Sequence, residues 1–313
     1  MPPARQPTDR GFGAGLGFGI SAYVLWGFLP IYFVQLVPAS AWEIVAFRIL
    51  LALGFCIVLL TVTRSWPAFI ALARQPRVLG IMTVAGVLIY INWQVYILAV
   101  VSGHVVEGAL GYFINPIVTV LLGVVFLRER LRPVQWIALG ISAAAILVIA
   151  IGYGTFPWIA LTLAFSFGLY GYIKKRVGQQ VDAVSGLTLE TAVLTPVAVV
   201  ILVVVALTGG IVTGTAGAGQ LILMLCAGAI TATPLLLFAA AARRLPLVYI
   251  GLTQYLAPVM QFIVGVVLLR EDMPAERWIG FGLVWVALIL LTADMLASGR
   301  VQRRHPIEPG LIG

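Results

Sequence analysis

The sequence predicts an all-α integral membrane protein whose ten transmembrane helices form two inverted repeats of five helices each. Three observations lead to this prediction: an apolar composition, ten apolar runs of helix length, and an internal repeat whose two copies differ in loop charge. Of the 313 residues, 62% are apolar and 10% are charged, whereas a soluble domain has roughly 45–50% apolar and about 25% charged residues. The composition therefore excludes soluble globular and disordered proteins.

Ten apolar runs are long enough to cross a bilayer as helices. An α-helix rises about 1.5 Å per residue, so about 20 apolar residues span the hydrocarbon core. Strands of a membrane barrel would alternate apolar and polar residues, but a stretch such as 201–206 is apolar on every side. The runs occupy residues 14–37, 44–63, 78–101, 105–126, 134–152, 156–173, 185–207, 220–242, 246–269 and 278–297.

The first run has some features of a secretory signal peptide. Arg5 and Arg10 precede it, and Ala39-Ser40-Ala41 follows it. The apolar core of a signal peptide has roughly 7–15 residues, and this run has about twice that number. We therefore expect a retained helix.

Basic residues are concentrated in alternate loops. If the N-terminus is cytoplasmic, sixteen of the nineteen Lys and Arg residues fall in cytoplasmic segments, only Arg270 and Arg277 fall outside, and Arg48 lies within a helix. Positively charged loops stay in the cytoplasm, so we expect both terminal tails, 1–13 and 298–313, to be cytoplasmic. The charges are spread in small groups rather than gathered in one patch, which argues against nucleic acid as a partner.

An internal repeat relates the two halves of the chain. Residues 110–140 align with residues 252–282 without a gap, at a shift of 142. Each half, residues 14–152 and residues 153–297, contains five runs, and an odd number of crossings makes the second copy enter the membrane from the opposite side. The loop at 128–132 has three arginines and one acid, whereas the loop at 270–277 has two arginines and three acids. Opposite loop charge is expected for inverted copies.

Inverted repeats are typical of secondary transporters, because two copies that exchange conformations open one central site to alternate sides. We therefore expect a transporter of small organic metabolites or drugs, more consistent with export than import. An integral-membrane enzyme acting on lipid, a channel-like facilitator, and a duplicated bundle without transport remain alternatives. The sequence has no metalloprotease, nucleotide-binding or serine-hydrolase motif, so we expect no catalytic residues, no metal and no cofactor.

Several segments resemble the RarD branch of the drug/metabolite transporter superfamily. The resemblance extends over residues 11–296, and it implies a multi-pass protein of the bacterial inner membrane with two EamA-type repeats. It also implies a central path along the third, fourth, eighth and ninth helices. The segments that carry the resemblance are Asn92-Trp93 with Tyr96, residues 107–116, residues 187–191, residues 231–235, and Gln254-Tyr255 before Pro258.

Two ionisable residues lie inside predicted helices at equivalent positions of the repeat, Arg48 and Glu190. A charge near the bilayer centre costs roughly 2.5–3.5 kcal/mol on insertion scales, so such residues are candidates for function. Arg48 could bind an anionic group of the substrate, or it could extend to the lipid headgroups instead. Direct pairing of Arg48 with Glu190 would require both side chains to approach the midplane.

The fourth predicted helix has a polar face. Glu107 and Asn115 lie on one side of it, and Pro116 removes a backbone hydrogen bond and favours a kink or break. Glu107 is therefore a candidate for proton exchange, or alternatively a cap of the helix. The ninth helix has Gln254 and Gln261 around Pro258, without a second carboxylate.

Asn92 and Tyr96 lie on one face of the third predicted helix, next to Trp93. Aromatic side chains suit flat or cationic ligands, although they also fill protein cores and mark the headgroup belt. Trp26 and Tyr112 extend this candidate lining. A stripe of glycines near the N-terminus suits close helix packing, within a monomer or in a weak homodimer.

Overall fold

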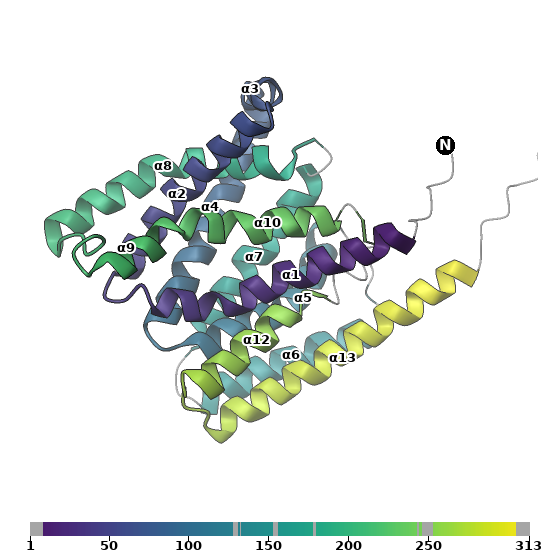
Figure 1. Ribbon diagram of the computed structural model, residues 1–313. Helices are drawn as coiled ribbons and strands as arrows, with labels where there is room; N and C mark the ends of the chain where they lie inside the picture. Colours follow the sequence, from purple (N-terminus) through teal and green to yellow (C-terminus); the bar gives the residue numbers. More distant parts are fainter. Residues whose placement is uncertain are drawn as a thin grey trace, which may run out of the picture. The chain divides into compact units, whose positions relative to one another are not determined.

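The computed structural model describes residues 9–127, 131, 133–152, 156–177, 180–242, 244–245 and 253–304 (Figure 1). Within these residues the secondary structure is helical, with no β-strand, which confirms the predicted all-α class. Part of the predicted pattern lies outside the described residues: the arginines of the loop at 128–132, Arg5, Arg243 and the first residues of the ninth apolar run.

The chain forms two compact parts, and each is described by itself. The first part comprises residues 1–122 and 157–272, and the second comprises residues 123–156 and 273–313. The helices along the chain are α1 (Asp9–Val34), α2 (Ala41–Val62), α3 (Trp66–Ala73), α4 (Pro76–Val101), α5 (Val105–Leu127), α6 (Pro133–Gly152), α7 (Trp158–Val177), α8 (Ala183–Thr208), α9 (Ala218–Leu225), α10 (Ala227–Ala242), α12 (Leu256–Ile263), the π-helix η1 (Val264–Leu268) and α13 (Ala275–Arg304).

Apolar side chains cover the outside of the helices. Among the described residues, six helical segments are long and apolar enough to cross a membrane, and shorter apolar helices accompany them. On α8, Val200, Val203, Val204 and Leu207 are 52–82% exposed. Such a surface is unfavourable in water and favourable against lipid, so the helices are those of an integral membrane protein.

Local sequence signals explain where the helices begin. Ser40 precedes α2, and its side chain accepts a hydrogen bond from the backbone N–H of Glu43 at 3.2 Å. Pro76 and Pro133 occupy the first positions of α4 and α6, where a missing N–H costs nothing. Asp182 precedes α8 and accepts hydrogen bonds from the backbone N–H groups of the first helical turn.

The N-cap of α8 predicts a measurable effect of pH. Partial burial of Asp182 opposes ionisation, but hydrogen bonds from Ser185 and Val184 outweigh burial and lower the pKa of the carboxyl group below 3.8. A lowered pKa adds stability above the unfolded pKa, and this stability is lost as the pH falls through the folded pKa. Asp182→Asn keeps a capping side chain without the charge. We expect wild type to exceed this variant in melting temperature at neutral pH. The difference should begin to shrink as the pH falls below about 4, and it should vanish only below the lowered pKa of the folded protein.

The experiment is a series of melting curves in detergent between neutral and acidic pH. Asp182→Ala serves as the control, because it removes the cap at every pH and is expected to cost about 1 kcal/mol. A difference between wild type and Asp182→Asn that stays constant across the series would contradict the prediction.

Three features depart from the predicted spans. The eighth run forms two helices, α9 and α10, which meet at Cys226. A short helix that was not predicted, α3, lies between α2 and α4. A kink or break is predicted at Pro116, and the structure has no break there, because α5 continues through this proline as one helix.

The internal repeat is visible in the helix boundaries. Three pairs of helices begin 142 residues apart: α2 and α8, α4 and α9, and α6 and α13. The packing within the first part follows the same relation, since α1 packs along α10 and α4 packs along α7. Likewise α2 contacts α10 while α4 contacts α8. The repeat seen between residues 110–140 and 252–282 therefore extends to the helices on either side.

Helices α2 and α8 occupy equivalent positions of the repeat and run antiparallel. At the start of α2, the carboxylate of Glu43 accepts hydrogen bonds from the backbone N–H groups of Val212 and Thr213, which follow α8. Near the other end of α2, Cys56 contacts Thr188 near the start of α8. Equivalent helices thus point in opposite directions.

Two equivalent glycines bring backbones close together. A Cβ atom at Gly86 of α4 would lie 3.4 Å from the carbonyl oxygen of Glu190, and one at Gly228 of α10 would lie 2.3 Å from that of Leu51. A real Cβ atom is not found at the shorter distance. The α2–α10 crossing therefore requires glycine at position 228, whereas the α4–α8 crossing leaves more room for a side chain at position 86.

In the second part of the chain, α6 and α13 lie side by side (Figure 1). The amide nitrogen of Gln135 near the start of α6 donates to a carboxylate oxygen of Asp294 at 3.1 Å. Asp294 lies late in α13, so these two helices also run antiparallel.

Candidate functional site

Arg48 lies in a chamber of aromatic side chains inside the first part of the chain. Its side chain is only 4% exposed. The guanidinium carbon lies 4.3 Å from the centre of the Trp93 ring and 5.4 Å from that of Phe33, and Nε donates a hydrogen bond to Oγ1 of Thr231 at 2.9 Å. Three tyrosines lie near the guanidinium: Tyr32, Tyr96 and Tyr112. We call these residues the Arg48 chamber.

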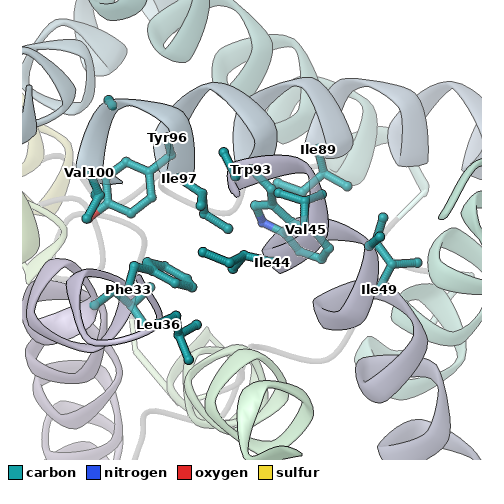
Figure 2. Packing of buried hydrophobic residues seen from close by; sticks show 14 of the residues in the cluster. Phe33, Leu36, Ile44, Val45, Ile49, Ile89, Trp93, Tyr96, Ile97 and Val100 are labelled. Atoms are coloured by element: carbon teal, nitrogen blue, oxygen red, sulfur yellow. The ribbon is translucent and has the colours of Figure 1, made fainter. Parts of the chain in front are cut away.

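The walls of the chamber come from neighbouring helices. Figure 2 shows Phe33 of α1 and Tyr96 of α4 projecting toward one another, and their ring centres are 6.3 Å apart. The rings of Tyr96 and Tyr112 are 5.5 Å apart. Apolar neighbours such as Ile44 and Ile97 are completely buried around them.

The charge of Arg48 is only partly compensated by these contacts. Each cation–π contact contributes roughly 0.5–2 kcal/mol, whereas removing a charge from water costs several kcal/mol. Within the described residues, no carboxylate oxygen lies within 4.0 Å of the guanidinium. The chamber therefore has an excess of positive charge, and an anion would be attracted to it.

Asn92 joins three helices through a hydrogen-bond network. Its amide nitrogen donates to the carbonyl oxygen of Leu163 and to Oγ of Ser166, both at 3.1 Å. Its amide oxygen accepts from the hydroxyl of Tyr112 at 3.0 Å. These bonds connect α4 with α7 and α5, and they fix the orientation of Tyr112 in the wall of the chamber.

This network predicts a stability effect. Asn92→Ala removes three buried hydrogen bonds, although Ser166 Oγ still donates to the carbonyl oxygen of Leu163 at 3.3 Å. We expect a loss of about 2 kcal/mol in the free energy of unfolding. Tyr112→Phe removes a single donor and should cost about half as much. Unfolding in mixed micelles measures both, and an Asn92→Ala variant as stable as wild type would contradict the expectation.

Glu190 has its own partners in α7. Lys174 Nζ lies 2.8 Å from Oε1 of Glu190, and the Tyr170 hydroxyl donates to Oε2 at 3.2 Å. Glu190 is 1% exposed, whereas the Lys174 side chain is 31% exposed. The carboxylate is thus neutralised inside the protein by a lysine that extends inward from the end of its helix.

Arg48 and Glu190 do not form an ion pair. Each lies seven residues, or about 10 Å, from the start of its helix, and α2 and α8 run antiparallel. Cys56, eight residues after Arg48, contacts Thr188, two residues before Glu190, so the two side chains are offset by about 9 Å along the helix axes by the helical rise. The pairing left open by the sequence is replaced by Lys174–Glu190, while Arg48 is bonded to Thr231.

Trp26 and Gln261 meet in a second cluster. The amide nitrogen of Gln261 in α12 donates to the backbone carbonyl of Trp26 in α1 at 3.0 Å. The Trp26 ring lies 5.2 Å from that of Tyr23 and 5.9 Å from that of Phe238. Gln254 is half-buried in the turn before α12 and makes none of these contacts.

The polar residues of α5 face different surroundings. Glu107 is half-buried in the first turn of the helix. Asn115 is 8% exposed, and its amide oxygen would lie 3.3 Å from a Cβ atom at Gly168 of α7. Asn115 thus packs at the α5–α7 contact, where a side chain larger than hydrogen at position 168 would be crowded.

Several residues of the site were not predicted from the sequence. Lys174 was counted only as a basic residue of a cytoplasmic loop, and Tyr170 and Thr231 were not singled out. The repeat contains a signal that identifies Lys174: it lies 16 residues before Glu190, as Tyr32 lies before Arg48. The same spacing of ionisable residues in both repeats indicates that the two side chains of each pair lie at the same depth in the membrane.

Comparisons with known proteins agree with this architecture. The model of the EamA-like transporter family matches residues 13–151. The chain is 45% identical to Protein RarD of Streptomyces exfoliatus, covering 92% of this chain and 91% of the relative. It is 39% identical to the uncharacterized transporter YojE of Bacillus subtilis, covering 93% and 97%. A solved crystal structure that is 17% identical matches 89% of this chain with a TM-score of 0.58, which supports the fold alone.

Proposed function

Because the chain belongs to the EamA family of the drug/metabolite transporter superfamily, we propose that it is a secondary transporter that exports small organic metabolites or drugs by alternating access. Within this family it is a RarD-like member, and thus a bacterial multi-pass membrane transporter. The single observation that carries this proposal is the antiparallel packing of equivalent helices. Two copies of one unit, facing opposite ways, can exchange conformations and open a shared site to one side at a time.

The repeat supports the number of crossings. In the proposed architecture, residues 14–152 and 153–297 each cross the membrane five times, with both termini in the cytoplasm. Segments expected on the same side lie together: Glu43 bonds the backbone of Val212 and Thr213, and Glu271 bonds the backbone N–H groups of Val105 and Val106. These contacts support the expected grouping of these segments on one side of the membrane. The distribution of arginine and lysine supports the assignment of the opposite side as cytoplasmic.

Topology is testable by tag accessibility in intact cells. A tag within residues 128–132 should be protected, whereas one within residues 270–277 should be accessible from outside. Both loops in one compartment would refute the inverted arrangement, and the transport mechanism with it.

The buried polar groups support a path for an organic solute. The Arg48 chamber and the Asn92 network are enclosed by helices of both repeats, and their walls combine rings with hydroxyl and amide groups. Such a lining suits amphipathic or aromatic molecules. A small organic solute is therefore the proposed partner, in a monomer or weak homodimer within the bilayer.

The proposal is tested in proteoliposomes. Labelled amino acids, aromatic metabolites and amphenicol drugs are offered, and we expect at least one to cross faster than in empty vesicles, to saturate, and to show counterflow when unlabelled solute is trapped inside. Flux without saturation would indicate a channel. No solute faster than in empty vesicles would refute transport, and turnover of labelled lipid by the purified protein would support the membrane enzyme instead.

Glu107 is the proposed site of proton coupling. Glu107→Gln removes the titratable group in the first turn of α5, so uptake driven by a pH gradient should be lost while solute binding is kept. Glu276→Gln, which changes a carboxylate in the first turn of α13, is the matched control and should transport normally. Unchanged pH-driven transport by Glu107→Gln would exclude this role.

A further inference from the structure

We propose that the Arg48 chamber binds the carboxylate of an aromatic organic acid, so that the transported solutes are monoanions without an ammonium group. This inference rests on the proposed transport function and specifies the substrate class of the same site. It is carried by the charges and hydrogen-bonding groups that surround Arg48, considered in turn below.

The first step is the balance of charge. Among the described residues of the first part, two carboxylates are buried and both have partners: Glu43 accepts two backbone hydrogen bonds, and Glu190 is paired with Lys174. Of the described residues, none places a carboxylate within ion-pair distance of Arg48. A bound anion would supply the counter-charge that the described residues do not provide and would offset the cost of burying Arg48.

The second step is the geometry of the donors. The guanidinium has five N–H groups in a planar fork, and its hydrogen bond to the described residues is the one from Nε to Thr231. The guanidinium carbon lies over the Trp93 ring, and the remaining N–H groups make no hydrogen bond to the described residues. A carboxylate accepts two parallel hydrogen bonds from one edge of such a fork.

The third step is an independent observation at Tyr96. This side chain is 3% exposed, and its hydroxyl has no hydrogen-bond partner among the described residues. The Tyr96 ring packs against Phe33, which Arg48 also contacts, and against Tyr112, whose hydroxyl is already bonded to Asn92. An unpartnered buried hydroxyl is unfavourable, and a carboxylate held by Arg48 would supply its acceptor.

The fourth step concerns the body of the ligand. The walls around Arg48 are rings, with Phe33 and Trp93 closest to the charge, so the part of the ligand attached to its carboxylate is flat and apolar. An α-ammonium group would need an acidic partner, and the described chamber residues contain none. The site therefore favours simple aromatic acids over amino acids.

The test uses the purified full-length protein in detergent, with phenylacetate as the probe. Binding is measured by calorimetry and by thermal shift, since a ligand that binds the folded protein raises its apparent stability by RT ln(1 + [L]/Kd). Phenylacetamide, phenethylamine and phenylalanine are matched neutral, cationic and zwitterionic compounds. We expect phenylacetate to bind at least about tenfold more tightly than each of these, a difference of about 1.4 kcal/mol. Benzoate and indoleacetate extend the series in size, and chloride tests for an inorganic anion.

Variants of the chamber locate the site. Arg48→Gln should abolish the preference for the acid, and Arg48→Lys should weaken phenylacetate binding about tenfold because the bidentate fork is lost. Tyr96→Phe should weaken it about threefold to tenfold. Arg74→Gln, which removes an exposed arginine before α4, is the control and should bind as wild type does. If Arg48→Gln fails to fold, the lysine and phenylalanine variants decide the question.

Three results would overturn the inference: equal affinity for phenylacetate and phenylacetamide, wild-type affinity in Arg48→Lys and Tyr96→Phe, or binding of chloride without any of the three acids. These results are separable from the transport test. If proteoliposomes move neutral solutes but no aromatic acid binds, the transport function stands and the carboxylate site is refuted. If aromatic acids bind through Arg48 but no solute crosses, the site stands and transport is refuted.

Discussion

Replacing Gly228 by alanine should prevent normal folding. The new methyl carbon would lie 2.3 Å from the carbonyl oxygen and 2.6 Å from the carbonyl carbon of Leu51. Both atoms belong to the backbone of α2, so α10 and α2 must move apart as whole helices. Overpacking of a well-packed interior typically costs 1–3 kcal/mol and sometimes more, and here about 3 kcal/mol or more is expected. Because Thr231, the partner of Arg48, lies one turn further along α10, the Arg48 chamber should be disturbed as well.

The measurement is the yield of monodisperse protein in detergent, followed by the melting temperature of any folded fraction. Gly86→Ala is the matched control, since it changes the equivalent residue of the other repeat. Its methyl carbon would lie 3.4 Å from the nearest backbone oxygen, and we expect a change of less than about 1 kcal/mol. If the two variants had the same yield and melting temperature, α10 and α2 would not approach each other as closely as described.

The second large effect is expected at Lys174. Lys174→Met removes the counter-charge of Glu190 and leaves a carboxylate that is 1% exposed without its cation. Breaking a buried pair on one side typically costs 3–5 kcal/mol. Glu190→Gln should cost much less, about 1 kcal/mol, because Lys174 is 31% exposed and its ammonium can turn to solvent. The Tyr170 hydroxyl retains an acceptor in the glutamine.

The double variant separates the charge from the packing. Lys174→Met combined with Glu190→Gln leaves no buried charge, and it should recover most of the stability lost in Lys174→Met alone. Unfolding in mixed micelles gives the three free energies. Additive losses in the double variant would mean that the two side chains do not interact, contrary to the 2.8 Å contact.

Sequence reasoning located most helices because their signals are local. An apolar run of about 20 residues, a serine or aspartate before it, or a proline at its first position determines a helix and its start without knowledge of the neighbours. The boundaries of α2, α4 and α6 follow the predicted runs closely, and the all-α class is confirmed. The division of the eighth run at Cys226 was missed, because the residues on either side of it are equally apolar.

The site was harder to predict, because its contacts join residues far apart in the chain. Arg48 and Glu190 were identified by their charge, but Thr231 is 183 residues from Arg48, and no local pattern connects them. Lys174 was assigned to a loop, since the distribution of basic residues says which side a lysine lies on but not how far its chain reaches inward. The sequence singles out Trp26 and Gln261 separately, but their contact, across 235 residues, follows from helix packing.

The ion pair between Lys174 and Glu190 has no equivalent in the other half, where Tyr32 and Arg48 occupy the matching positions. Two chemically identical halves would give two conformations related by a two-fold rotation, with equal free energy and equal populations in the absence of solute. A salt bridge in one half alone removes this degeneracy, and a difference of a few kcal/mol leaves the minor conformation below about one part in a hundred. Without solute, the carrier should therefore be found mostly in one of its two conformations, open to one side of the membrane. Binding of the solute would have to supply the free energy that shifts the populations toward the other conformation.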